Sequence, residues 1–131
     1  MRLRLVLPSL LALLALLATS TLAGCGGTSA YCGEVEDRQK HLSEVVASGE
    51  KNALIDALPD FRALRDKAPD DIRDEWTTVI DAVERLRRAV ASKDEDATAA
   101  AATALQSDAV SDALVGVQQE VRDVCHTPLT L

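Results

Sequence analysis

Two apolar seams with helical spacing restrict what this chain can fold into. In one seam the apolar positions lie 4, 3, 4, 3 and 4 residues apart, at Ile72, Trp76, Val79, Val83, Leu86 and Val90. In the other they lie 4, 3, 4 and 3 residues apart, at Val110, Leu114, Val117, Val121 and Val124. This spacing puts apolar side chains on one stripe of an α-helix, and the stripe must be covered by another element. We therefore expect an all-α fold.

The first half of the chain also favours helices, with one proline break. A first helix is expected over residues 30–48, where Gly49 ends it. A second begins near Glu50, but Pro59 lies inside its apolar pattern. Because proline removes a backbone donor and clashes with the preceding turn, this helix should be kinked or split at Leu58.

Further helices are expected over residues 69–91, where Pro69 suits a first helical position, and over the alanine-rich residues 97–105. A last helix would start at a cap formed by Ser107 or Asp108 and end near residue 125. Pro128 keeps residues 126–131 out of that helix, so they form a C-terminal tail.

The N-terminus has the pattern of a secretory leader. Arg2 and Arg4 precede an apolar run over residues 5–18, which is too short to span a bilayer because a spanning helix needs about 20 apolar residues. Leu22, Ala23, Gly24 and Cys25 follow, in the order of a lipobox, and this stretch resembles the processing site of bacterial lipoproteins. The resemblance implies cleavage before Cys25 and lipidation of its thiol. A conventional signal peptide followed by an ordinary cysteine, or an uncleaved anchor, are the alternatives.

Cleavage would leave 107 residues, enough for one domain, with 12 basic and 21 acidic residues and a net charge of −9. This charge argues against nucleic acid as a partner and against adhesion to anionic lipid. The expected organisation is a leader over residues 1–24, a lipidated Cys25 with a short tether over 25–29, a helical domain over 30–125 and the tail over 126–131.

With Cys25 lipidated, Cys32 and Cys125 remain, and a pair of cysteines in an exported chain most simply forms a disulfide. A metal site that uses both of them with His126 is the alternative, although structural zinc sites usually contain closely paired cysteines. The two cysteines fall near the start of the first helix and the end of the last. They lie at the same end of an up-down bundle only if the number of long helices is even. We therefore expect about four helices, closed by one disulfide.

Three short stretches of the chain carry a resemblance. Tyr31-Cys32, the run from Ala68 to Trp76, and Val124-Cys125 resemble small two-cysteine helical lipoproteins and secreted proteins of actinobacteria. The resemblance implies a helical fold and a location outside the cytoplasm. It implies no activity and no functional residues.

The sequence offers little catalytic chemistry. His41 and His126 are expected at the surface, and no metal-binding, phosphate-binding or nucleophile motif is present. Phe61 and Trp76 fit the apolar seams, so they are expected in the core rather than in a binding groove. We expect no cofactor, no metal and no enzymatic activity.

Two hypotheses for the function follow. The first is a non-catalytic domain, held by its lipid on the extracytoplasmic face of the cell membrane, that binds or positions a partner in the cell envelope. The alternative is a carrier of a small apolar ligand or lipid, which requires a roomy cavity lined by leucine and valine between the helices.

Overall fold

The computed structural model describes residues 26–131, and its regular structure over this range is entirely helical. Six α-helices are followed by a π-helical segment, η1 (Val121–Cys125). The α-helices are α1 (Gly26–Ser48), α2 (Lys51–Asp56), α3 (Leu58–Lys67), α4 (Arg73–Ser92), α5 (Glu95–Ala104) and α6 (Asp108–Glu120). No helix in this range is long and apolar enough to cross a membrane. The all-α prediction is confirmed.

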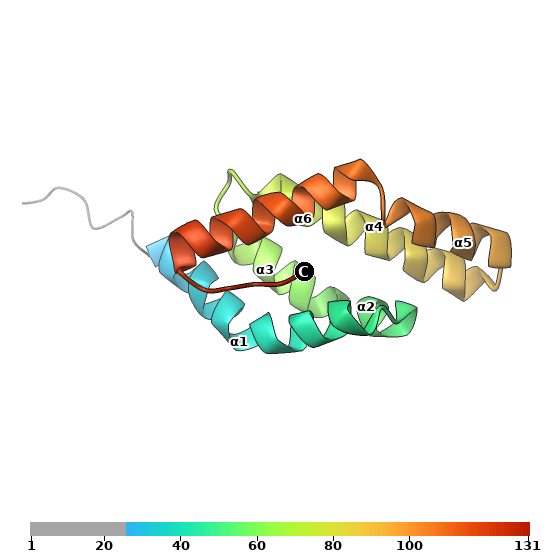
Figure 1. Cartoon of the computed structure of the whole chain (residues 1–131), viewed down its shortest axis with the longest axis horizontal. Helices are drawn as coiled ribbons and strands as arrows, with labels where there is room; N and C mark the ends of the chain where they lie inside the picture. The colour runs from blue at the N-terminus through green and yellow to red at the C-terminus, as the bar shows by residue number, and fades with distance from the viewer. Residues whose placement is uncertain (1–25) are drawn as a thin grey trace, which may run out of the picture.

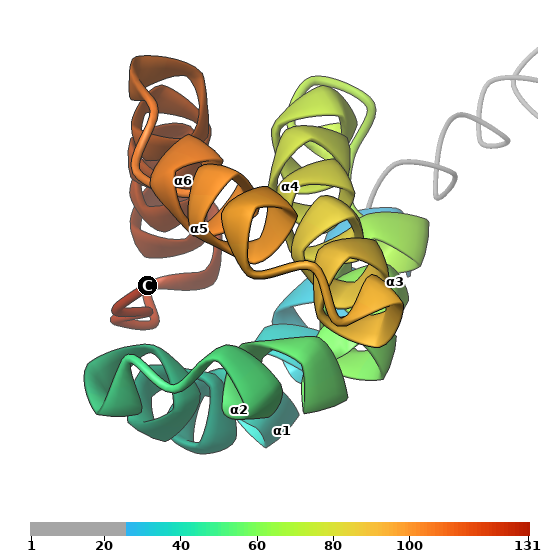
Figure 2. The ribbon, with the colours of Figure 1, turned by 90° about the vertical axis from the view of Figure 1, so that its right-hand side faces the viewer.

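Helix α4 is the centre of the arrangement. It packs against α2, α3, α5 and α6, while α1 packs against α3 and η1. Figure 1 shows that the chain runs along α1, returns through α2 and α3, runs out again along α4 and returns through α5 and α6. The start of α1 and the end of η1 therefore lie at the same end of the molecule. At the other end of the molecule, which faces the viewer in Figure 2, α1 and α2 lie apart from α5 and α6.

Six α-helices are present where about four were predicted. The second expected helix is split into α2 and α3 at Ala57, one residue before the predicted break, and Pro59 occupies the first turn of α3. The alanine-rich helix and the last helix, which were expected as separate helices, are α5 and α6, and the Ser107 hydroxyl accepts a hydrogen bond from the Val110 N–H at the start of α6. Gly49 ends α1 with a positive φ of 63°.

Two predicted helix starts were wrong. Residues 26–29, expected as a tether, belong to α1, because extending an existing helix adds a hydrogen bond for each residue fixed and this offsets the cost of the glycines. Helix α4 starts at Arg73 rather than Pro69, and residues 70–72 form a turn in which the Ile72 N–H donates to the Pro69 carbonyl. Ile72 is nevertheless buried, so it still contributes to the seam.

The two predicted seams form much of the core. Trp76, Val83, Val117 and Val121 belong to the main hydrophobic cluster, while Val90, Leu114 and Val124 are only half-buried. A second, smaller cluster lies between α4 and α5 and consists of Leu86, Ala89 and Ala101. Because alanine buries little area, this cluster contributes less burial energy than the main one.

Gly116 lies where α6 contacts α4. A Cβ atom at this position would be 3.4 Å from Cγ of Glu75 and 3.7 Å from Cδ1 of Ile72. These are ordinary van der Waals distances, so an alanine would fit here, whereas a longer side chain would have to displace one of these neighbours. A glycine in the middle of a helix costs stability, and here it is placed where the two helices are in contact.

Candidate functional site

The predicted lipidation site cannot be placed. Cys25 and the peptidase-recognition residues Leu22, Ala23 and Gly24 lie outside the described residues. The first described residue, Gly26, directly follows Cys25 in the sequence and begins α1. Lipidation of Cys25 stays a prediction from the sequence.

The predicted disulfide is confirmed. Cys32 in α1 is bonded to Cys125 at the end of η1, with a Cα–Cα distance of 5.2 Å and 93 residues of sequence separation. Both sulfur atoms are used in this bond, so they are not available as metal ligands together with His126. Within residues 26–131 no group of three or more potential ligand side chains is suitably placed for a metal ion.

A buried aromatic pair lies beside the disulfide. Trp76 Nε1 donates a hydrogen bond of 2.9 Å to the hydroxyl of Tyr31, the residue directly before Cys32, and both side chains are fully buried. Burial raises the pKa of Tyr31 to about 12, against a smaller lowering by the Trp76 hydrogen bond, and the Glu120 carboxylate raises it further. Tyr31 is therefore a neutral hydrogen-bonding residue of the core. Its position four residues before Val35 was the sequence signal for this, since both share one helix face.

The predicted surface histidines are both exposed, and His41 takes part in a charged network. His41 Nδ1 lies 2.9 Å from Asp60 Oδ2, and Arg38 Nε donates to the other oxygen of Asp60 at 3.1 Å. Arg38 also pairs with Glu34, so the network connects α1 to the first turn of α3. These contacts hold two helices together.

Glu84 is the centre of a second network, which joins α3 to α4. It pairs with Arg62 of α3 and with Arg87 of α4, and the Arg88 guanidinium is 4.0 Å away. The arginines are largely exposed, whereas the Glu84 side chain is mostly covered by them. The charged face of α4 therefore also makes a contact between helices.

Glu120 has a raised pKa, which gives a testable dependence on pH. Its carboxyl group is partly desolvated and lies near Asp71 and Asp123, so its pKa is above the ordinary value of 4.5. The charged form is therefore disfavoured in the folded state relative to the unfolded state. This cost is present above the raised pKa and disappears as the pH falls through it and below 4.5.

We accordingly expect Glu120→Gln to raise the melting temperature slightly at pH 7 and to leave it unchanged at pH 4. Thermal unfolding followed by circular dichroism at both pH values measures this. Glu36→Gln on the exposed face of α1 is the control, because it removes the same charge away from Asp71 and Asp123. An equal gain from both variants would show that only the overall charge matters.

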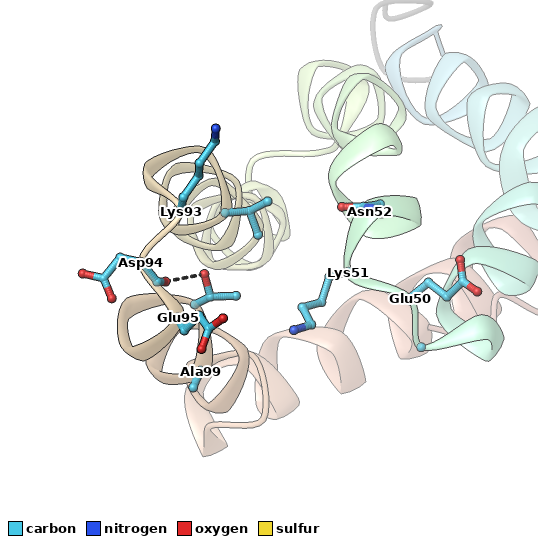
Figure 3. Close-up of a pocket in the computed structure, with 10 residues that line it drawn as sticks. Glu50, Lys51, Asn52, Lys93, Asp94, Glu95 and Ala99 are labelled. Carbon is cyan, nitrogen blue, oxygen red and sulfur yellow. Dashed lines mark hydrogen bonds between the residues drawn. The ribbon is translucent and has the colours of Figure 1, made fainter.

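The clefts differ from the cavity that the carrier hypothesis requires. One of about 860 Å³ lies between the start of α2 and the turn from α4 to α5 (Figure 3). Its lining is mostly polar and charged, and Lys51 extends from α2 toward α5. The Thr98 hydroxyl on its α5 side is already donated to the Asp94 carbonyl at 2.7 Å. A second, between α4 and α5, is lined by five alanines together with Arg85 and Arg88.

The C-terminal residues hold a feature that the sequence did not predict. Residues 126–131, expected as a tail, fold back so that Thr127 and Leu129 are buried. His126, at their start, has a positive φ of 55°. The available signal was the alternation of Leu129 and Leu131 with polar or proline positions, but a segment this short has too few residues to establish a period.

The comparisons with known proteins provide no relative. No family model, no curated protein and no solved structure matches this chain. The resemblance to two-cysteine lipoproteins of actinobacteria therefore stays a prediction from the sequence.

Proposed function

We propose that the protein is a lipid-anchored, non-catalytic domain on the extracytoplasmic face of the cell membrane, where it binds or positions a partner of the cell envelope. The observation that carries the proposal is the Cys32–Cys125 disulfide. Disulfides persist in oxidising compartments and are rare in the cytosol, so this bond supports export of the chain. The leader and the lipobox before Cys25 supply the route and the anchor.

The position of the disulfide supports a particular orientation. It joins α1 and η1 at the end of the molecule where α1 begins, directly after Cys25 (Figure 1). A lipid on Cys25 would hold this end next to the bilayer. The turn between α1 and α2 and the turn between α4 and α5 would then face away from the membrane. Without the leader the chain has a net charge of −9, so anionic lipid would not attract it and the acyl chains must supply the attachment.

A binding role is supported by how the polar side chains are used. Tyr31 and Trp76 satisfy each other in the core, and Asp60 and Glu84 hold helices together through arginine. These groups maintain the shape of the domain. What the domain offers to a partner is a rigid helical surface, stapled by a disulfide and kept at the membrane.

The lipid anchor is tested by replacing Cys25. We expect the full-length protein expressed in a bacterium to incorporate labelled palmitate and to fractionate with membranes. Cys25→Ser should abolish the labelling and shift the protein to the unprocessed or the released fraction. Mass spectrometry of the purified protein should find a diacylglyceryl group on an N-terminal Cys25.

The control variant is Cys32→Ser with Cys125→Ser, which removes two thiols but keeps the lipobox. It should still be labelled. Labelling of Cys25→Ser at the level of the natural sequence, or an unmodified Cys25 in the mature protein, would refute the lipid anchor.

A further inference from the structure

The last five residues lie between two helices as a strap, here defined as residues 127–131. The Ser43 hydroxyl of α1 donates to the Thr130 carbonyl at 3.1 Å, and the Gln118 amide of α6 donates to the Leu131 carbonyl at 3.2 Å. Leu129 is 5% exposed and belongs to the main hydrophobic cluster. Figure 1 shows the strap running from the end of η1 into the space between α6 and α1.

The helices hold the strap in a way that depends little on its sequence. Both bonds from α1 and α6 end on main-chain oxygen atoms rather than on side chains of the strap. Pro128 and Thr130 are exposed, so the main apolar anchor is Leu129, with a partly buried Leu131 beside it. Main-chain bonds combined with pockets for alternate side chains are a common mode of recognising an extended peptide. A segment from another protein with a leucine in the same place can make the same contacts.

The strap is joined to the bundle at an unusual point of the backbone. It follows η1, a π-helical segment, and His126, which adopts the left-handed conformation. π-Helical turns are rare in proteins, but where they occur they are often at functional sites. A left-handed conformation is also unfavourable for a residue other than glycine. Because Cys125 is bonded to α1, rotation at His126 can move the strap while the end of η1 stays in place.

The strap also leaves space beside it. A hollow of about 440 Å³ lies between the strap and the end of the last helix, where Gln118 and Arg122 form one wall and strap residues the other. The strap is therefore anchored through the buried Thr127 and Leu129, the partly buried Leu131 and two main-chain oxygen atoms, and open space borders part of its α6 side. A segment held at a few points and bordered by open space can be released without breaking up the helices.

We propose that the groove between α1 and α6 is a binding site for an extended segment of a partner protein, and that the strap is an autoinhibitory occupant that this segment displaces. The inference rests on the proposed binding function and names its site. The partner is recognised by a free main chain and a leucine at the position of Leu129. If the strap occupies the groove in about nine of every ten molecules, it lowers the apparent affinity for the partner about tenfold.

The test uses residues 26–131 and the same protein without residues 127–131, each with the disulfide formed. The probe is a fluorescein-labelled peptide with the sequence of residues 127–131, and its binding is followed by fluorescence anisotropy. We expect the truncated protein to bind the peptide at least tenfold more tightly than the full domain. A peptide with Leu129→Ser should lose most of this affinity.

Two further variants locate the binding site. In the truncated protein, Ser43→Ala combined with Gln118→Ala should weaken peptide binding several-fold, whereas Val115→Ala on the exposed face of α6 should not. In the full-length domain, Leu129→Ser should release the strap and raise the affinity for the natural peptide. Because Leu129→Ser keeps every residue of the domain, it distinguishes release of the strap from the effect of shortening the chain.

Equal peptide binding by the full and truncated proteins would overturn the proposal, as would no binding by a truncated protein that keeps its helical circular dichroism. Loss of the helical fold on truncation would overturn it too, because the strap would then be an indispensable part of the core. The assay uses residues 26–131 without lipid, so its result does not depend on acylation of Cys25. Likewise, absence of peptide binding does not contradict the proposed lipid anchor.

Discussion

Replacing Cys32 and Cys125 together by serine is expected to lower the free energy of unfolding by about 2–5 kcal/mol. The bond connects residues that are 93 positions apart, so its removal frees almost the whole domain in the unfolded state. For a domain of this size the melting temperature should fall by roughly 10–30 °C. Thermal unfolding of residues 26–131 by circular dichroism, with and without reductant, measures the effect.

The natural protein in reductant should reach the melting temperature of the double variant, since both lack the same bond. The double variant itself should not respond to reductant. The single variants Cys32→Ser and Cys125→Ser are the matched controls, because each removes the bond and should melt like the double variant. A fall of less than about 3 °C in the double variant would mean that the closed loop contributes little to stability.

The second large effect is expected at Trp76. This side chain is fully buried, donates a hydrogen bond to Tyr31 and lies near Phe61, with 6.2 Å between the ring centroids. Trp76→Ala leaves a cavity at the point where α4 meets the main cluster, and should destabilise the domain by about 3–5 kcal/mol. Urea unfolding followed by circular dichroism measures this loss.

Tyr31→Phe separates the hydrogen bond from the packing. It keeps the ring of Tyr31 but leaves the Trp76 N–H buried without a partner, at an expected cost of about 1–3 kcal/mol. Tyr31→Phe combined with Trp76→Phe should cost less than the sum of the two single changes, because the bond can be lost only once. Strictly additive costs would show that the two groups do not depend on each other in the fold.

The long helices were predictable because their signals are local and repeated. The seam around Trp76 and Val83 extends over several helical turns. Pro59 and Gly49 interrupt or end a helix through their own backbone properties, whatever their tertiary contacts. The pairing of Cys32 with Cys125 followed from the cysteine count, because these two remain in an exported chain once Cys25 is assigned to the lipid. These features depend on neighbours in the sequence or on simple topology.

The features that the sequence did not predict depend on contacts between distant residues. The strap is placed by Ser43 and Gln118, and neither side chain distinguishes itself in the sequence from other exposed polar residues. Helix α4 starts at Arg73, after a turn in which the Ile72 side chain is buried in the main cluster. The break before α6 was visible as a cap at Ser107, but a cap alone does not show that α5 and α6 continue along the same neighbour.

The candidate site was less predictable than the fold. The lipobox is recognised by a processing enzyme as a linear sequence, so Cys25 can be named without a three-dimensional structure. A binding groove has no such linear code. It arises only when α1 and α6 come to lie on either side of residues 127–131, and no pattern within α1 or α6 alone indicates it.

The link between α1 and η1 also decides how the domain responds to mechanical load. A pull on the start of α1 and on residue 131 reaches Cys32 and Cys125 first, and the covalent bond carries the tension from one to the other. Only residues 26–31 and 126–131 lie outside this shortcut and can lengthen. The segment between the two cysteines is shielded, so stretching cannot unravel its helices while the bridge is intact.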